Sequence, residues 1–374
     1  MGEINITIAS KDIVVNNPNI NNDNSNESSN DENSNVFVDK PIVETDNKME
    51  VDSKEETISP DIPLNSIKEF NLVALGEIMM GGEINKNVDY NYLLAFKEIS
   101  DITSKGDYTV AHLATNVTKL DKIENPKSKY IVTNKIDNAF GALGIDGLCL
   151  ATEHMLDFGK DIFLDTKALL EDDYDLIGLK NNIIYVENDG IELAIIGVCN
   201  EVIGSEGAYT NAGIMVYNMA KLKEMIKEAK QNAQAVILMT HLGYENTHQI
   251  TSIMDWFYKE LIKAGADLVI GSHSIGVYPI EIYNGKPIIY SLGYLMHDTN
   301  YEVGKKSGIF NFKFNEIGKL VEIKVTPTYI NAKKQTLLYS EYDKNGANEF
   351  LKYIAGDLNN CSINDNVLTV NLDK

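Results

Sequence analysis

Four histidines of this 374-residue chain stand at or near the carboxyl ends of predicted strands. His112 lies within the run YTVAHLA, and His154 follows DGLCLA after a short turn. His241 directly follows AVILMT, and His273 follows ADLVIG after one residue. Imidazole is a common metal ligand and a general acid or base near neutral pH. Because ligands of α/β sheets bind beyond the carboxyl ends of the strands, these four side chains are expected to converge on one site.

Two carboxylates also stand at or near the carboxyl ends of predicted strands. Glu77 follows the predicted strand NLVALG, and Glu153 directly precedes His154. A mixed set of imidazoles and carboxylates suits zinc, manganese or iron. A single histidine at a strand end is more often a hydrogen-bonded structural residue than a ligand. His248 and His297 lie on the approach to a helix and after a hairpin, and we expect them to be solvated or to line a rim rather than to act as ligands. It is the convergence of four such positions that favours a functional site.

These side chains must be positioned by a layered α/β domain. Short, continuous apolar runs, typical of strands covered on both faces, alternate with amphipathic segments in the middle of the chain. Asn-Asp-Gly at 188–190 and Asn-Gly at 284–285 predict antiparallel hairpins, and therefore a mixed or second sheet. A two-sheet sandwich flanked by helices fits both features. Helices are predicted over residues 90–103, 136–143, 155–171, 219–231 and 250–264.

Composition divides the chain into three parts. Residues 1–66 are rich in Asn, Ser and acidic residues, which predicts a disordered leader. Residues 67–332 carry all the strand-end histidines and form the predicted domain. Residues 333–374 are expected to pack on it as a C-terminal extension, with a helix over 347–354 and a strand over 367–372.

The charge and cysteine content exclude several classes of protein. The formal net charge of -22 disfavours a nucleic-acid binder and docking on an anionic membrane. The three cysteines form neither a CxxC pair nor an even disulfide framework. No apolar run is long enough for a transmembrane helix, and the start does not resemble a signal peptide. We therefore expect a soluble cytoplasmic protein, or a cell-surface protein if an N-terminal anchor has been removed.

The order of the motifs resembles the CapA family of poly-γ-glutamate capsule synthesis proteins. The blocks that carry this resemblance span residues 69–329 and read GEIMMGG, AHLAT, LATEHMLDFG, HLGYE and GSHSIGVYPIEIYNGKPIIYSLGY. The resemblance implies a calcineurin-like metallophosphoesterase fold, which is an α/β/β/α sandwich of two mixed sheets with helices outside. It also implies a role in capsule or envelope polymer synthesis, usually at the bacterial cell surface.

Several positions depart from the family's pattern. Glu77 stands where the family has Asp, while His112 and Glu153 stand where it has Asn. Ala114 and Ile275 replace a Glu and a His, so two metal donors are lost. Leu242 replaces a Trp and Tyr294 an Asn. Six positions match: His154, Asp157, Gly159, His241, Glu245 and His273.

The resemblance implies one retained site for a divalent metal, zinc, manganese or iron, unless the departures have emptied it. Its ligands would be Glu77, His112, Glu153, His241 and His273. His154 would be the general acid, and the residues around the substrate or behind the ligands would be Asp157, Glu245 and Tyr294.

Three functions fit these features. The first is a metal-dependent hydrolase or transferase that acts on a phosphoester or amide bond in envelope polymer assembly. The second is a non-catalytic pseudoenzyme that serves as a scaffold or binding module in a polymer synthesis or export assembly. The third is a cytoplasmic α/β protein whose histidines are structural. In the first two, the partners are the polymer or its synthesis and export machinery, and no nucleic acid.

Overall fold

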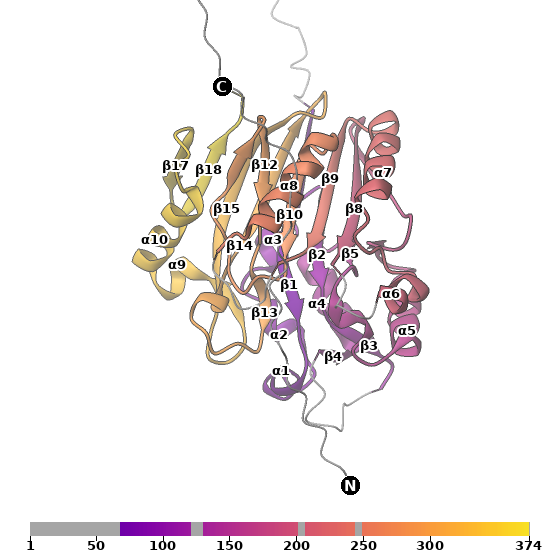
Figure 1. The fold of residues 1–374 in the computed structure, drawn as a ribbon. Helices are drawn as coiled ribbons and strands as arrows, with labels where there is room; N and C mark the ends of the chain where they lie inside the picture. Colours follow the sequence, from indigo (N-terminus) through magenta and orange to yellow (C-terminus); the bar gives the residue numbers. More distant parts are fainter. Residues whose placement is uncertain (1–67, 121–129, 201–205, 244–248, 374) are drawn as a thin grey trace, which may run out of the picture. The chain divides into compact units, whose positions relative to one another are not determined.

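The computed structural model describes residues 68–120, 130–200, 206–243 and 249–373. The predicted leader, residues 1–66, lies outside these ranges. Within them, no helix is long and apolar enough to cross a bilayer. The described residues are arranged mainly in two mixed sheets with helices packed against them (Figure 1).

The first sheet has ten strands, with β1 and β2 near its middle. Its path is β17-β18-β15-β14-β1-β2-β5-β6, with β13 also paired to β1 and β16 to β15. The strands are β1 (Glu69–Met79), β2 (Tyr108–Leu113), β5 (Gly147–Cys149), β6 (Asp175–Ile177), β13 (Tyr294–His297), β14 (Lys306–Asn315), β15 (Leu320–Ile330), β16 (Thr336–Leu338), β17 (Cys361–Asn364) and β18 (Val367–Asn371). β1, β2, β5 and β6 run parallel, which brings their carboxyl ends to the same edge.

The second sheet has six strands in the order β11-β12-β10-β9-β8-β7. They are β7 (Ile184–Asn188), β8 (Ile191–Cys199), β9 (Ala235–His241), β10 (Leu268–Ser272), β11 (Glu281–Tyr283) and β12 (Lys286–Ile289). Both predicted hairpins are present, β7–β8 and β11–β12. Asn284 and Gly285 have φ of 49° and 74°, the left-handed pair that a tight hairpin turn requires. A small parallel pair, β3 (Asn116–Thr118) and β4 (Ile131–Thr133), lies apart from both sheets.

Helices cover the outer faces of the sandwich. Helices α7 (Met219–Asn232) and α8 (Ser252–Ala264) pack on the second sheet, where Ile226 and Leu261 join one buried cluster with Val236. The others are α1 (Gly82–Asn87), α2 (Leu93–Phe96), α3 (Ser100–Thr103), α4 (Asp137–Leu143), α5 (Lys160–Leu170), α6 (Glu206–Ala212), α9 (Tyr339–Tyr342) and α10 (Lys344–Ala355). Short 3₁₀ turns are η1 (Asn134–Ile136), η2 (Glu153–Leu156) and η3 (Val303–Lys305).

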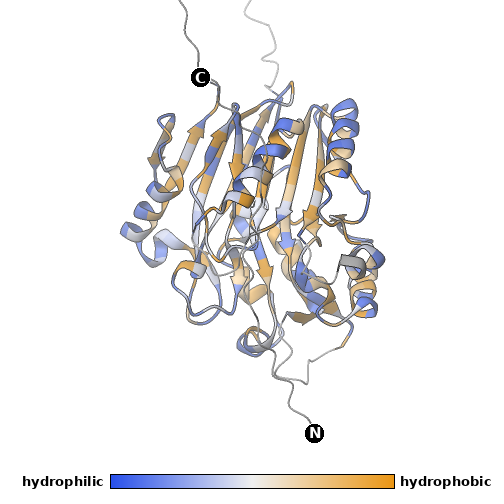
Figure 2. Ribbon diagram, viewed as in Figure 1, coloured by the Kyte–Doolittle hydropathy of each residue, from blue (hydrophilic) through white to orange (hydrophobic). Residues whose placement is uncertain are grey.

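The main core fills the space between the two sheets. Leu72 of β1 and Val110 of β2 belong to the same buried cluster as Ile237 of β9 and Ile270 of β10. Figure 2 shows hydrophobic residues concentrated along the strands, with polar residues on the helices. The predicted fold class, an α/β sandwich of two mixed sheets with helices outside, is confirmed.

Two of the predicted helices are interrupted. The helix predicted over 90–103 is wrong as a single element, because α2 and α3 are separate turns and Tyr90 has a φ of 58°. The helix predicted over 155–171 is likewise divided into η2 and α5 by Gly159, whose φ is 85°. Glycine adopts this conformation without the clash that a Cβ would cause. This break places Glu153 and His154 on a short turn of their own.

The described C-terminal residues 333–373 continue the first sheet. β18 pairs antiparallel with β15, and α10 packs against both strands. Helix α10 includes the predicted helix over 347–354, and β18 coincides with the predicted strand to within one residue.

Candidate metal centre

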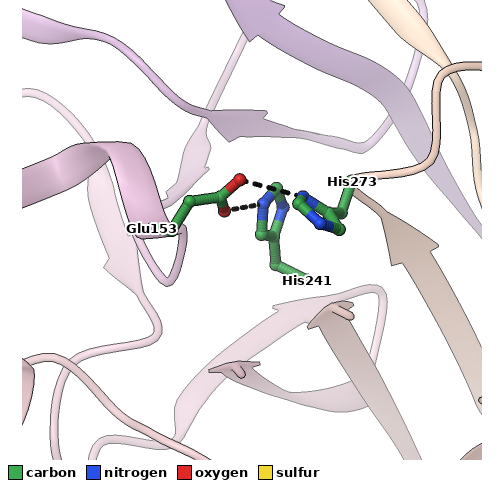
Figure 3. A group of neighbouring side chains, drawn as sticks. All are labelled: Glu153, His241 and His273. Carbon is green, nitrogen blue, oxygen red and sulfur yellow. Dashed lines mark ion pairs between the residues drawn. The ribbon is translucent and has the colours of Figure 1, made fainter. Parts of the chain in front are cut away.

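Glu153, His241 and His273 form a compact cluster at the carboxyl ends of the strands (Figure 3). The Nδ1 atom of His273 lies 2.9 Å from Oε1 of Glu153, and the other carboxylate oxygen contacts Nε2 of His241. The two imidazole rings are 4.7 Å apart between centroids. One ligand atom from each residue lies within 4.8 Å of the others, which is the spacing that a shared cation requires.

Strand register explains why the two histidines meet. His241 is the last residue of β9, and it pairs in parallel register with Ser272, the last residue of β10. His273 follows directly, so its side chain enters beside His241. Glu153 reaches the same place from the η2 turn after β5, in the other sheet. The site is therefore built across the sandwich.

The His273 backbone is held in an unusual conformation. Its φ is 85°, a region that non-glycine residues rarely adopt and that is often found at functional sites. The His273 N–H donates to Oε2 of Glu77 at 3.2 Å. Glu77 is 1% exposed, and burial raises the pKa of its carboxyl group even though His241 acts in the opposite direction. Glu77 thus supports the turn that presents His273.

Hydrogen bonding orients the His241 ring. Nδ1 of His241 lies 2.6 Å from Oγ of Ser272, and that hydroxyl also lies 3.4 Å from the Thr240 carbonyl. Nε2 of His241 therefore faces the Glu153 carboxylate. In the metal-free protein a proton on Nε2 links the two groups, and a cation bound between them would take the place of that proton, so the donor set fits a metal ion.

Further buried acceptors surround the cluster. His112 is fully buried, and neither of its ring nitrogens has a hydrogen-bond partner among the described residues. Burial, followed by the neighbouring His241, lowers the pKa of His112 to about 3, so the ring is neutral and can donate a lone pair. Its ring centroid lies 6.3 Å from that of His241. Within the same ranges, Oε1 of Glu77 also has no partner. Unsatisfied buried groups are costly. The group of side chains spaced to share one cation comprises Glu153, His241 and His273, and His112 and Glu77 lie next to it without belonging to it.

The two histidines of the cluster keep the Glu153 carboxyl group ionised. Burial alone would raise the pKa of Glu153, but His241 and His273 together lower it well below its ordinary value. Glu153 is therefore ionised, as a metal ligand must be.

His154 lies at the edge of the cluster. Its Nδ1 contacts Oδ2 of Asp157 at 2.8 Å, and its Nε2 is 3.4 Å from Oε1 of Glu153. Burial opposes the charged imidazolium, but the hydrogen bond to Asp157 and the nearby carboxylates together raise the pKa of His154. A protonated His154 could therefore serve as an acid beside the cluster.

The structure also shows where the remaining candidates lie. Tyr294 is 2% exposed and pairs with Glu77 in the β1–β13 register, so it is a buried neighbour of Glu77. Ala114 and Ile275 are buried apolar residues where the resemblance implied donors. Glu245 and His248 lie outside the described residues.

Three supporting residues were not predicted. The Tyr209 hydroxyl donates to the Glu153 carbonyl at 2.7 Å, and the Asn116 amide donates to the His154 carbonyl at 2.9 Å. These bonds fix the η2 turn from two other elements, α6 and β3. Nothing in the sequence around Tyr209 indicated this contact. Ser272, adjacent to His273, could have been found from its position alone.

Comparisons with known proteins point to capsule synthesis. The model of the family described as "Bacterial capsule synthesis protein PGA_cap" matches residues 71–299. The chain is 27% identical over 295 residues to the capsule biosynthesis protein CapA of Bacillus anthracis, covering 74% of this chain and 72% of that protein. It is 26% identical over 271 residues to the PGA biosynthesis protein CapA of Bacillus subtilis (strain 168), covering 69% and 70%. A solved structure titled as GAP50, the anchor in the inner membrane complex of Plasmodium, is 13% identical with a TM-score of 0.42, covering 72% of this chain and 88% of that chain.

Proposed function

Because this chain belongs to the bacterial capsule synthesis protein family PGA_cap, we propose that it acts in the synthesis or export of an envelope polymer of the poly-γ-glutamate type. We further propose that it does so as a metal-dependent hydrolase-like protein with one retained metal centre. The observation that carries this proposal is the convergence of Glu153, His241 and His273 across the two sheets.

The proposed ligands are the three residues of this cluster together with His112 and Glu77. Glu153 presents both carboxylate oxygens to the two histidines, and Ser272 orients His241 with Nε2 toward the centre. A zinc, manganese or iron ion held there would act as a Lewis acid on a phosphoryl or carbonyl oxygen.

In this proposal, His154 donates the proton to the leaving group. Asp157 accepts a hydrogen bond from Nδ1, so the transferable proton is carried on Nε2, which faces the cluster. The hydrogen bonds of Tyr209 and Asn116 to the η2 turn keep His154 and Glu153 in fixed positions relative to each other.

A second function is supported by the two lost donors. Ala114 and Ile275 are buried, 0% and 6% exposed, and neither apolar side chain can supply a ligand atom. A centre reduced in this way could keep a structural ion, or none, and the protein would then be a binding module of the polymer assembly.

Metal content and turnover together distinguish the two functions. We expect about one equivalent of zinc, manganese or iron per chain by elemental analysis after excess ion is removed. The loaded protein is then assayed on aryl phosphoesters and on γ-linked glutamate oligomers. Turnover that is lost on chelation supports the hydrolase, whereas bound metal without turnover of either substrate supports the binding module. If no metal is retained with any of the three ions, the metal-dependent function is wrong.

The substitution His112→Leu separates a ligand role from a structural one. Leucine has about the bulk of histidine but lacks its two unsatisfied buried nitrogens. In the metal-free protein, the substitution should therefore raise the free energy of unfolding by about 1 kcal/mol. In the loaded protein, loss of a ligand should weaken metal binding by more than about 100-fold, which exceeds the effect of losing a residue that only orients a ligand. Chemical denaturation and calorimetric titration measure these two effects. Unchanged metal affinity would remove His112 from the ligand set.

A further inference from the structure

Two cavities lie side by side next to the candidate metal centre and share one wall, His297 and Asp298. The smaller has a volume of about 80 Å³ and is lined also by Met79, Gly81, Gly82 and Tyr130. The larger, about 410 Å³, extends over Tyr294 and the segment 299–301 to Ile275. We call the two together the His297 groove.

The groove lies beside the metal centre. The Tyr130 ring, in the wall of the smaller cavity, lies 4.5 Å from the ring of His154, which in turn lies beside Glu153. In the wall of the larger cavity, Ile275 is two residues after His273, and Tyr294 pairs with Glu77. Wall residues of both cavities are thus neighbours of residues at the centre.

Rings form one continuous surface of this groove. His297 stacks on Tyr294, with 4.4 Å between ring centroids and 22° between ring planes. Tyr130 lies 6.2 Å from His297 at 24°. Such ring faces suit planar groups, because stacked arrangements at these separations are favourable.

An ion pair holds the rim of the groove in place. The Lys334 ammonium lies 2.7 Å from Oδ1 of Asp298 and donates to the Thr299 carbonyl at 3.1 Å. The Lys334 side chain is 12% exposed and that of Asp298 is 41% exposed, so solvent reaches this pair mainly from the Asp298 side. The loop 298–301 is thus anchored by the β15–β16 turn before anything binds.

We propose that the His297 groove binds an extended, amide-linked chain that leads to the metal centre. The proposal rests on the proposed function and names the substrate's binding path. Cavities on both sides of His297 fit a chain that continues past the ring, rather than a compact molecule. Planar amides match the ring faces, and the Asn300 side-chain amide offers a donor and an acceptor at their edges.

Charge makes this binding depend on the metal. A polyanionic chain would be repelled by Glu77 and Glu153 at the head of the groove, since like charges at short range in a buried site interact strongly. A divalent ion between them reverses the sign of that potential. A carboxylated chain should therefore bind the loaded protein more tightly than the metal-free protein.

The test is the affinity of a fluorescent γ-linked glutamate oligomer for the manganese-loaded protein, measured by anisotropy. We expect His297→Ala and Asn300→Ala to weaken binding, His297→Ala by about tenfold. Asn300 is exposed, so its substitution leaves the fold intact. Tyr353→Ala is the matched control, because Tyr353 is an aromatic residue, 47% exposed, that lines a different cavity. Manganese content is measured in every sample.

The outcomes separate the groove from the metal function. If manganese is bound but both groove variants bind the oligomer as tightly as the control, the groove is wrong and the proposed function stands. If none of zinc, manganese or iron is bound and the groove variants still weaken binding of the oligomer, the metal-dependent function fails and the groove stands. Binding of an uncharged oligosaccharide in place of the glutamate oligomer would overturn the amide-linked assignment.

Discussion

Replacing His241 with alanine is expected to abolish stoichiometric metal binding. His241 is the central member of the cluster, with Glu153 on Nε2 and Ser272 on Nδ1. Alanine removes one of three converging donors and leaves Glu153 and His273 without their shared neighbour. Loss of a residue that only orients a ligand typically costs about 10–100-fold in metal affinity, so loss of the ligand itself should exceed about 100-fold.

Metal content is measured by elemental analysis after equilibrium dialysis, alongside calorimetric titration. His297→Ala is the control, because it removes an imidazole that belongs to the groove and not to the cluster. His241 is 2% exposed, so alanine also leaves a cavity. Glu153→Gln therefore provides a second variant, which removes the charge while keeping the shape. If both variants retain one equivalent of metal at wild-type affinity, the cluster is not the binding site.

The sequence alone predicted that the histidines at the ends of strands would lie close together. His241 and His273 lie at the ends of β9 and β10, two continuous apolar runs that could only be buried strands. Parallel pairing of neighbouring strands then places their ends together. The same reasoning found Glu153, since β5 ends four residues before it.

The supporting contacts could not be predicted in this way. Tyr209 reaches the Glu153 carbonyl from a helix 56 residues further along the chain, and no periodicity encodes that approach. The strained φ of His273 depends on the hydrogen bond from its N–H to Glu77 in the other sheet. Both features depend on how the two sheets pack, which is a tertiary property rather than a local one.

The division of residues 155–171 shows a different limit. Its apolar spacing favoured one helix, but Gly159 adopts a φ of 85°, and a separate helix, α5, begins directly after it. A glycine inside a helical pattern is ambiguous from sequence, because it can be tolerated or can end the element. Because of this break, the η2 turn is a separate element from α5, and it places Glu153 and His154 facing the second sheet.

The same chemical change should have opposite effects at Gly271 and at Gly141. At Gly271, in β10, a Cβ would lie 2.2 Å from the Tyr290 carbonyl oxygen and 2.2 Å from the Tyr258 hydroxyl. Backbone cannot yield cheaply, so Gly271→Ala should lower the free energy of unfolding by about 3 kcal/mol. Gly141, in α4, has nothing within 4 Å of its Cβ position. Gly141→Ala should raise the same free energy by about 0.5–1 kcal/mol, because alanine loses less entropy on entering a helix.

Gly271 also links stability to the metal centre. It stands two residues before His273, and its carbonyl accepts a hydrogen bond from Leu292 N–H at 3.0 Å. Moving β10 away from Tyr290 would therefore shift His273 relative to Glu153, so Gly271→Ala should also weaken metal binding while Gly141→Ala leaves it unchanged. Urea unfolding and metal titration of the two variants measure both effects. Equal stability of the two variants would show that α8 and β12 do not pack this closely on β10. If Gly271→Ala instead loses stability but keeps its metal affinity, His273 is held by Glu77 alone.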